Sequence, residues 1–155
     1  MKLMKNLIIL TLLIGWQFAT AQDHKSEINW HLDFKKAQKI AKKQHKPIII
    51  LFTGSDWCPP CRAMHRDLFV NKEFVELSKK AVFVYVDFPR RTALSTEQRQ
   101  KNYELKMKYR ARGGVPAMVA VTPEGKVIKE IVGYRFGFPM GHISFIKEVV
   151  AYMKG

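Results

Sequence analysis

Apolar and polar residues follow two different rhythms along this chain, and each rhythm predicts a type of secondary structure. Residues 48–52 and 82–86 are unbroken apolar runs, which are typical of strands covered on both faces of a sheet. Five other stretches place apolar residues at helical spacing, and Asp33 and Asn71 stand where N-caps are expected. The predicted helices cover residues 34–46, 59–69, 72–79, 96–109 and 141–153.

The last two predicted strands, residues 117–122 and 127–132, are close enough along the chain to form a hairpin. The residues between them, Pro123-Glu124-Gly125-Lys126, have the length and composition of a hairpin turn. Strands separated by helices pair in parallel, whereas a hairpin adds antiparallel strands. The sequence therefore predicts an α/β domain with a central mixed β-sheet and helices on both faces. Polar residues 22–30 are expected to be a flexible lead-in.

The start of the chain has the features of a secretory signal peptide. Lysines precede the apolar stretch 7–19, and Ala19-Thr20-Ala21 follows it with the small-x-small pattern of a cleavage site. We expect residues 1–21 to be a signal peptide and residues 22–155 to be the mature domain, either periplasmic or secreted. An uncleaved N-terminal anchor is the alternative. The apolar stretch has 13 residues, which is short for a bilayer span, so no stable membrane insertion is expected after cleavage.

The chain is basic, with a formal net charge of +14. Such a balance can favour nucleic acid, membrane surfaces or acidic partners. Here the charges are spread over several segments, such as 35–43 and 106–112, and no nucleic-acid-binding motif accompanies them. We interpret them as solvated helix faces and expect no nucleic-acid partner.

The two cysteines, Cys58 and Cys61, stand three positions apart at the predicted start of a helix. A cross-link over so short a loop adds little to stability, which favours a chemical role. Helix N-termini favour negative charge, so the pKa of the Cys58 thiol should be lowered, and Cys61 is near enough to resolve a mixed disulfide. Pro59 and Pro60 carry no amide hydrogen. We therefore expect a less stabilised thiolate, and a weaker oxidant, than with two ordinary residues between the cysteines.

Trp57-Cys58-Pro59-Pro60-Cys61 after an apolar strand, with Gly114-Val115-Pro116 before a closing hairpin and helix, resembles the thioredoxin superfamily. The opening of the chain is similar to the exported thioredoxin-like, thiol-disulfide interchange branch. The resemblance implies a thioredoxin-like fold in which Cys58 attacks and Cys61 resolves. It also implies that Pro116 is a cis-proline facing the cysteines, and that substrate contacts Trp57, Val115, Pro116 and Gly133.

One position departs from the pattern that the resemblance implies. Phe52 stands six residues before the first cysteine, where thioredoxins have a buried acid that moves protons during exchange. Asp56 and water are candidates for that task. A second departure is the long aromatic segment 134–140, which would form either an apolar lip for a partner or core packing under a loop.

These observations predict a thiol-disulfide oxidoreductase that exchanges electrons with protein disulfides or dithiols, with the reductase direction favoured. It needs a redox partner that recycles the motif and no cofactor. No metal site is expected, because Cys58, Cys61 and His65 give only three ligands. The alternative is a non-enzymatic thioredoxin-fold binding module with a locked disulfide. The remaining histidines are isolated and are expected at the surface: His24, His31, His45 and His142.

Overall fold

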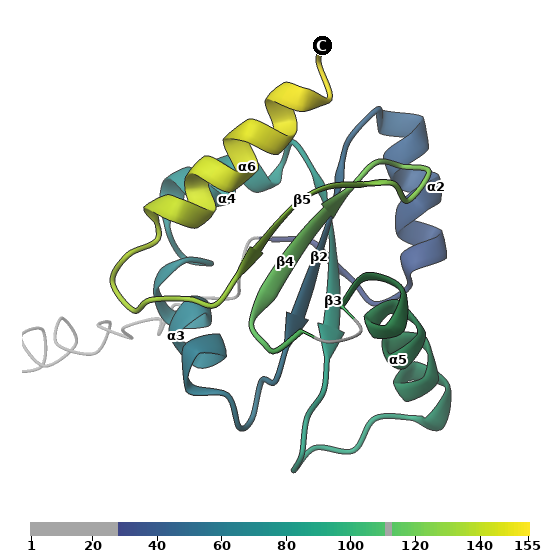
Figure 1. The fold of residues 1–155 in the computed structure, drawn as a ribbon, viewed down its shortest axis with the longest axis vertical. Helices are drawn as coiled ribbons and strands as arrows, with labels where there is room; N and C mark the ends of the chain where they lie inside the picture. The colour runs from purple at the N-terminus through teal and green to yellow at the C-terminus, as the bar shows by residue number, and fades with distance from the viewer. Residues whose placement is uncertain (1–27, 111–112) are drawn as a thin grey trace, which may run out of the picture.

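A mixed sheet of five strands forms the centre of the fold (Figure 1). The computed structural model describes residues 28–110 and 113–155, so the expected signal peptide, its cleavage site and His24 lie outside the described residues. In chain order the strands are β1 Trp30–His31, β2 Ile48–Thr53, β3 Val82–Asp87, β4 Ala117–Val121 and β5 Val127–Val132. Across the sheet their order is β1-β3-β2-β4-β5. β3 runs parallel to β1 and β2, whereas β4 is antiparallel to both β2 and β5.

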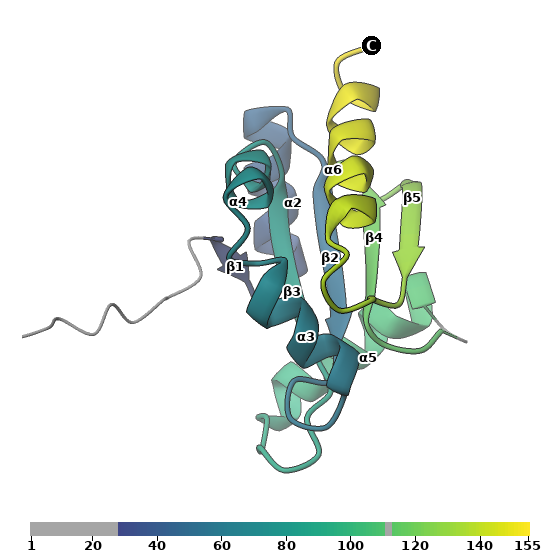
Figure 2. The ribbon, with the colours of Figure 1, turned by 90° about the vertical axis from the view of Figure 1, so that its left-hand side faces the viewer.

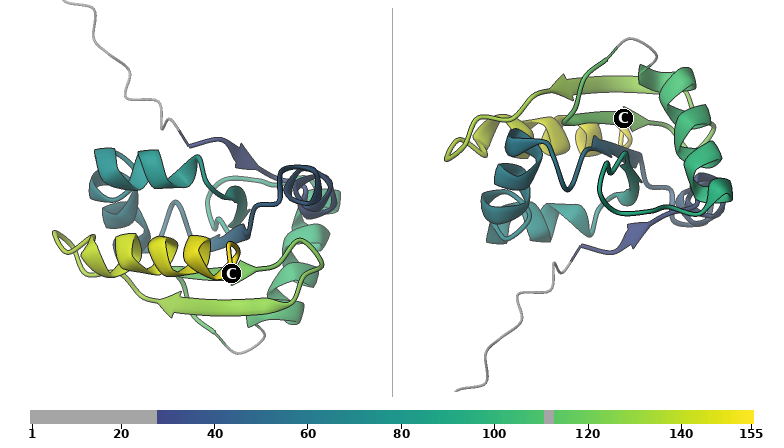
Figure 3. Two further views of the ribbon diagram at one scale, coloured as in Figure 1. Left: turned by 90° about the horizontal axis from the view of Figure 1, so that it is seen from above. Right: turned by 90° about the horizontal axis from the view of Figure 1, so that it is seen from below.

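In the described part of the chain, five helices cover the two faces of this sheet (Figures 1 and 3). They are α2 Phe34–Gln44, α3 Pro59–Asp67, α4 Lys72–Ser78, α5 Thr96–Arg110 and α6 Met140–Tyr152. α2 and α5 pack on one face, and α3, α4 and α6 pack on the other. The predicted fold class is confirmed, and the predicted bounds agree with these within two residues. Within the described residues, no helix is long and apolar enough to cross a membrane.

The central strand β2 explains how the two cores are kept apart. All six of its residues are buried, as its unbroken apolar run predicts. Because successive side chains alternate across a sheet, Ile49 and Leu51 join the core under α3, α4 and α6. Ile48, Ile50 and Phe52 join the core under α2 and α5. The strand that leads to the cysteines is thus held on both faces and by a neighbour on each side.

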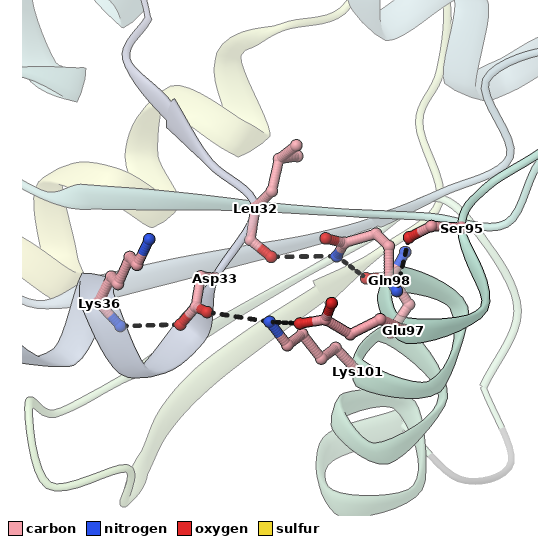
Figure 4. A network of polar contacts seen from close by, with 8 residues as sticks. Leu32, Asp33, Lys36, Ser95, Glu97, Gln98 and Lys101 are labelled. Atoms are coloured by element: carbon pink, nitrogen blue, oxygen red, sulfur yellow. Dashed lines mark hydrogen bonds and ion pairs between the residues drawn. The ribbon is translucent and has the colours of Figure 1, made fainter.

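The N-termini of α2 and α5 are tied together by a polar network at their first turns (Figure 4). Asp33 accepts the Lys36 amide at 2.9 Å, which lowers the pKa of its carboxyl group. Lys101 from α5 bridges Asp33 at 3.2 Å and Glu97 at 2.7 Å, and Gln98 donates to the Leu32 carbonyl at 3.1 Å. These contacts fix α5 against the start of α2 on the face away from the cysteine-bearing helix.

The expectation of an unstructured lead-in through residue 30 is wrong at its end. Trp30 and His31 form β1 beside β3, and Ile28 is buried. The Trp30 ring lies edge-on to Phe69, Phe83 and Tyr85, with centroid distances of 5.1, 5.3 and 5.3 Å. A two-residue strand has no period that could be read from sequence. Aromatic contacts made in the tertiary structure define it instead.

The expectation that His142 is a surface residue is also wrong, because its side chain is only 5% exposed. It lies in the first turn of α6, under the segment that follows β5, and its ring is 5.1 Å from that of Tyr134. Burial lowers the pKa of His142 to about 4, although a hydrogen bond with the Gly133 backbone acts in the opposite direction. His31 is half-buried and His45 is exposed.

If β1 belongs to the domain, Trp30→Ala should lower the free energy of unfolding by about 2 kcal/mol, because it removes three aromatic contacts from a half-buried ring. Urea unfolding followed by circular dichroism measures this. Tyr152→Ala is the matched control, since that ring is 57% exposed, and it should change stability by no more than about 0.5 kcal/mol. Equal effects of the two substitutions would contradict the placement of β1.

Buried His142 should make stability depend on pH in a defined window. Its pKa in the folded chain, about 4, lies below its ordinary value of 6.5, so the unfolded chain binds the proton more readily. Its contribution is therefore complete above pH 6.5 and is lost as the pH falls through 4, by about 3 kcal/mol in total. Measured against wild type, His142→Gln should flatten the fall in stability between these pH values. If the stability of the two proteins falls in parallel with pH, the pKa of His142 is not lowered in the folded chain and the prediction is wrong.

Candidate functional site

The disulfide between Cys58 and Cys61 lies at the start of α3. Cys58 is the N-cap residue, in extended conformation, and its sulfur accepts the Cys61 amide at 3.3 Å. Pro59 and Pro60 occupy the first two helical positions, where their missing amides break no helical bond. In the first turn of α3, the Cys61 amide donates to the Cys58 sulfur. The two prolines between the cysteines predict this arrangement, because they carry no amide hydrogen.

Gly54 connects the end of β2 to this helix start. Its carbonyl accepts the Trp57 amide at 3.3 Å and the Cys58 amide at 2.9 Å, and its own amide donates to the Cys61 sulfur at 3.5 Å. A side chain at Gly54 would place a Cβ atom 2.5 Å from the Trp57 ring. The turn therefore requires glycine, and through it one residue contacts both cysteines. In the sequence alone, Gly54 indicates only that the apolar run 48–52 has ended.

The opposite wall of the site is the start of β4. The register between β2 and β4 pairs Phe52 with Ala117, so the residues just before Ala117 lie beside the end of β2, near the cysteines. The Val115–Pro116 peptide bond is cis, and the Val115 carbonyl is 3.7 Å from the Cys58 sulfur. Gly133 donates its amide to the Pro116 carbonyl at 2.8 Å. The structure thus brings Val115, Pro116 and Gly133 together beside Cys58.

Trp57 and Asp56 are fixed by the loop that follows β3. The Trp57 indole donates to the Phe88 carbonyl at 2.7 Å, and the Arg90 guanidinium lies 4.0 Å above its ring. The Asp56 carboxylate accepts the amides of Arg90, Arg91 and Thr92, and these bonds lower the pKa of its carboxyl group. That carboxylate is therefore occupied with holding the loop.

The disulfide lies just below the surface. Cys58 is 3% exposed and Cys61 is fully buried, although Pro59, Pro60 and Gly114 around them are exposed. Cys58 therefore keeps a small exposed area, whereas Cys61 has none.

Phe52, at the position where the resemblance implies an acid, is 1% exposed and faces the α2 and α5 side of the sheet. It lines a cavity of about 120 Å³ together with apolar residues that include Trp57 and Val115. Two cationic side chains, Lys106 and Arg110, also line this cavity. No carboxylate lines this cavity among the described residues.

A polar cluster that sequence reasoning missed lies beside the motif, at the end of β3. Asp87 accepts the Ser55 amide at 2.9 Å and the Ser55 hydroxyl at 2.5 Å, so it anchors the turn next to Gly54. The Tyr85 hydroxyl is 3.3 Å from Nε2 of His65, which lies one helical turn after Cys61. Burial, and then the Asp87 charge, raise the pKa of Tyr85, whereas burial lowers the pKa of His65. The sequence signal for this cluster is Asp87, an acidic residue at the end of the apolar strand β3.

Within residues 28–110 and 113–155, no group of three or more histidine, cysteine or acidic side chains is placed to hold a metal ion.

Comparisons with known proteins agree with this geometry. The family model described as a thioredoxin-like domain matches residues 34–136. The chain is 35% identical over 131 residues to the disulfide bond reductase DsbH of Chlamydia pneumoniae, covering 83% of this chain and 75% of that protein. It is 30% identical to the thioredoxin-related protein DsbJ of the same organism, covering 80% of this chain but only 37% of the length of DsbJ.

Solved structures with the thioredoxin-like fold also match this chain. The structure of the DsbH oxidoreductase superposes with a TM-score of 0.71 at 34% identity, covering 80% of this chain and 85% of that one. A thioredoxin from Thermus thermophilus, with a TM-score of 0.59 at 17% identity over 79% of this chain and 87% of that one, shares the fold. The chain is thus a homologue of a disulfide reductase and carries a C-x-x-C disulfide of its own. On the family match and these relatives, it belongs to the thioredoxin-like domain family.

Proposed function

We propose that this protein is an exported thiol-disulfide oxidoreductase that reduces disulfides in other proteins through Cys58-Pro59-Pro60-Cys61. The observation that carries the proposal is the position of the Cys58 sulfur. It caps α3, accepts the Cys61 amide at 3.3 Å and lies 3.7 Å from the Val115 carbonyl, before a cis peptide bond. Its place at a helix N-terminus favours the thiolate, which is the form that attacks disulfides.

In the reduced protein, the Cys58 thiolate attacks one sulfur of the substrate disulfide. A bond forms between Cys58 and the substrate, and the other substrate sulfur leaves as a thiolate that takes up a proton. Cys61 then loses its proton and attacks the Cys58 sulfur. The Cys58–Cys61 disulfide re-forms and the substrate leaves as a dithiol. Two electrons pass to the substrate, and a separate dithiol redox partner must reduce the motif again.

Four residues around Cys58 are proposed to hold the substrate. Trp57, which precedes Cys58, supplies an apolar platform, while Val115 and Pro116 offer backbone groups on the other side of the Cys58 sulfur. Gly133, bonded to the Pro116 carbonyl, forms the rim. These roles are supported by the 3.7 Å distance between the Cys58 sulfur and the Val115 carbonyl, and by the bond that joins Gly133 to the next residue, Pro116.

The reductase direction is proposed on two grounds. The two prolines leave a single first-turn amide on the Cys58 sulfur, so the thiolate gains less stabilisation and the motif is a weaker oxidant. The relative DsbH is named a disulfide bond reductase. The proposed location, periplasmic or secreted, rests on the signal-peptide pattern of residues 1–21, with residues 22–155 as the mature protein.

Substituting the cysteines tests the proposed function. Cys58→Ser should abolish the protein's acceleration of insulin reduction by dithiothreitol, because it removes the attacking sulfur. Cys61→Ala should instead leave substrate proteins covalently attached to Cys58, because nothing resolves the mixed disulfide. Non-reducing electrophoresis of the variant from its native host detects these adducts. Equal, negligible turnover by wild type and Cys58→Ser, with no adducts on Cys61→Ala, would favour the alternative of a binding module with a locked disulfide.

Restoring an amide to the first turn of α3 tests the role of the prolines. Pro60→Ala supplies an amide at the second helical position, from which a cap atom commonly accepts. The pKa of the Cys58 thiol should fall and the redox midpoint should become more oxidising, because the thiolate is better stabilised. Thiolate absorbance against pH, and equilibration with glutathione, measure the two quantities. Pro59→Ala is the control and should change less, since an amide at the first position does not point at the cap. A strongly acidic thiol in wild type would contradict the argument.

A further inference from the structure

The segment between β5 and α6 passes alongside α3, the helix that begins at the cysteines (Figures 1 and 2). At one end of the segment, Gly133 is bonded to the Pro116 carbonyl. Further along, the Gly137 amide donates to the Asp67 carboxylate at 2.8 Å, in the last turn of α3. Gly137 has a φ of +74°, which glycine adopts without strain. The segment is therefore fastened at both ends of α3, beside the cis peptide bond and at the helix C-terminus.

This fastening exposes a group of apolar side chains. Phe136 is 64% exposed, and Phe138 and Met140 are each 58% exposed. Large apolar side chains of a soluble domain are seldom left so open in a cluster, and such clusters mark interaction surfaces. Of the two readings of segment 134–140, core packing holds for one ring only. Its Tyr134 ring packs against the core, whereas Phe136, Phe138 and Met140 do not.

Two arginines flank these apolar side chains. The Arg66 guanidinium lies 5.9 Å from the centre of the Phe136 ring, and the Arg135 guanidinium lies 4.1 Å from that of Phe138. Among the ion pairs of the described residues, neither arginine takes part. We call this surface the arginine–phenylalanine lip, and it consists of Arg66, Arg135, Phe136, Phe138 and Met140. It offers apolar contact area together with two positive charges that take part in no ion pair among the described residues.

The lip lies within reach of a chain bound at Cys58. α3 has nine residues, so its last turn is about 13 Å from Cys58 at 1.5 Å per residue. An extended chain advances about 3.3 Å per residue. A substrate segment whose cysteine reacts with Cys58 would therefore place on the lip the side chains about four residues away.

We infer that the lip selects substrates, and that it binds an extended segment of the substrate protein with apolar and acidic side chains about four residues from the reacting cysteine. This rests on the proposed function. The apolar side chains cover Phe136, Phe138 and Met140, and the carboxylates pair with Arg66 and Arg135. Charge complementarity identifies the occupant, because an apolar segment alone would leave both guanidinium groups unpaired. The redox step at the cysteines is unchanged.

The test uses peptides of equal length, each with one cysteine joined by a disulfide to 2-mercaptoethanol. One peptide carries Phe and Glu about four residues to either side of the cysteine, the second carries Phe and Lys there, and the third carries Ser. Attack by the reduced protein releases the peptide thiol and 2-mercaptoethanol and leaves the Cys58–Cys61 disulfide. Wild type should show the highest kcat/KM with the Phe–Glu peptide.

Two double variants separate the contributions of charge and apolar area. Arg66→Gln with Arg135→Gln should lower kcat/KM for the Phe–Glu peptide by roughly fivefold to tenfold, as expected for two exposed charge pairs. Phe136→Ser with Phe138→Ser should lower it for both Phe-containing peptides. The matched control, Lys39→Gln with Lys42→Gln, removes the same charge from the exposed face of α2 and should change kcat/KM little. An equal loss in this control would overturn the assignment, since general electrostatic attraction would then explain the preference.

Bis(2-hydroxyethyl) disulfide, which is small and neutral, separates a failed lip from a failed enzyme. All variants should reduce it at the wild-type rate. If wild type reduces it but does not discriminate between the peptides, the lip assignment is wrong and the proposed function stands. If wild type reduces neither substrate, the proposed function itself is wrong. Binding to phosphatidylserine vesicles that is lost in the Phe136→Ser, Phe138→Ser variant, with peptide discrimination unchanged, would show that the lip meets a membrane surface instead.

Discussion

The Cys58 sulfur, which we propose as the reactive atom of the motif, is also the group that caps α3. It accepts the Cys61 amide where α3 begins, so the same atom satisfies the helix start and receives its electrostatic stabilisation. This works only if the helix start is held still. β2 provides that, because it is fully buried, paired on both sides and continued by the Gly54 turn that contacts both cysteines. The antiparallel register of β4 then brings the cis Val115–Pro116 bond to the same place.

Charge is distributed unevenly around this atom. On the α2 and α5 side of the sheet, buried Phe52 carries no charge, and the cavity that it lines has Lys106 and Arg110 among its lining residues. Across the sheet, Asp87 holds Ser55, and the Tyr85–His65 pair lies one helical turn beyond Cys61. A site without an acid at Phe52 avoids a buried negative charge next to the sulfur, where it would oppose the thiolate. Asp87 instead contributes through the backbone of the turn. The geometry of the motif thus depends on a few hydrogen bonds made by the turn after β2, where Gly54 contacts Cys61 and Ser55 contacts Asp87.

The fold alone does not determine what a protein of this architecture binds. A thioredoxin of 17% identity has the same architecture, yet an architecture does not say which protein will be bound. Specificity in such folds comes from the segments between the elements. Here one such segment carries exposed phenylalanines beside unpaired arginines and is fastened to the cysteine-bearing helix through Asp67. The helix that carries the chemistry therefore also positions the surface that would choose the substrate.

The sequence by itself determined every element except β1, and it placed the two cysteines at the start of a helix. Apolar periodicity, the caps at Asp33 and Asn71 and the two prolines after Cys58 are local signals, since each acts over a few neighbouring residues. The tertiary structure alone decided what depends on distant partners. β1 exists because Trp30 meets three aromatic rings, His142 is buried because α6 packs under the preceding segment, and Asp87 reaches Ser55 across 32 positions of sequence. Such contacts leave no pattern in the chain, because only the packing of elements brings their members together.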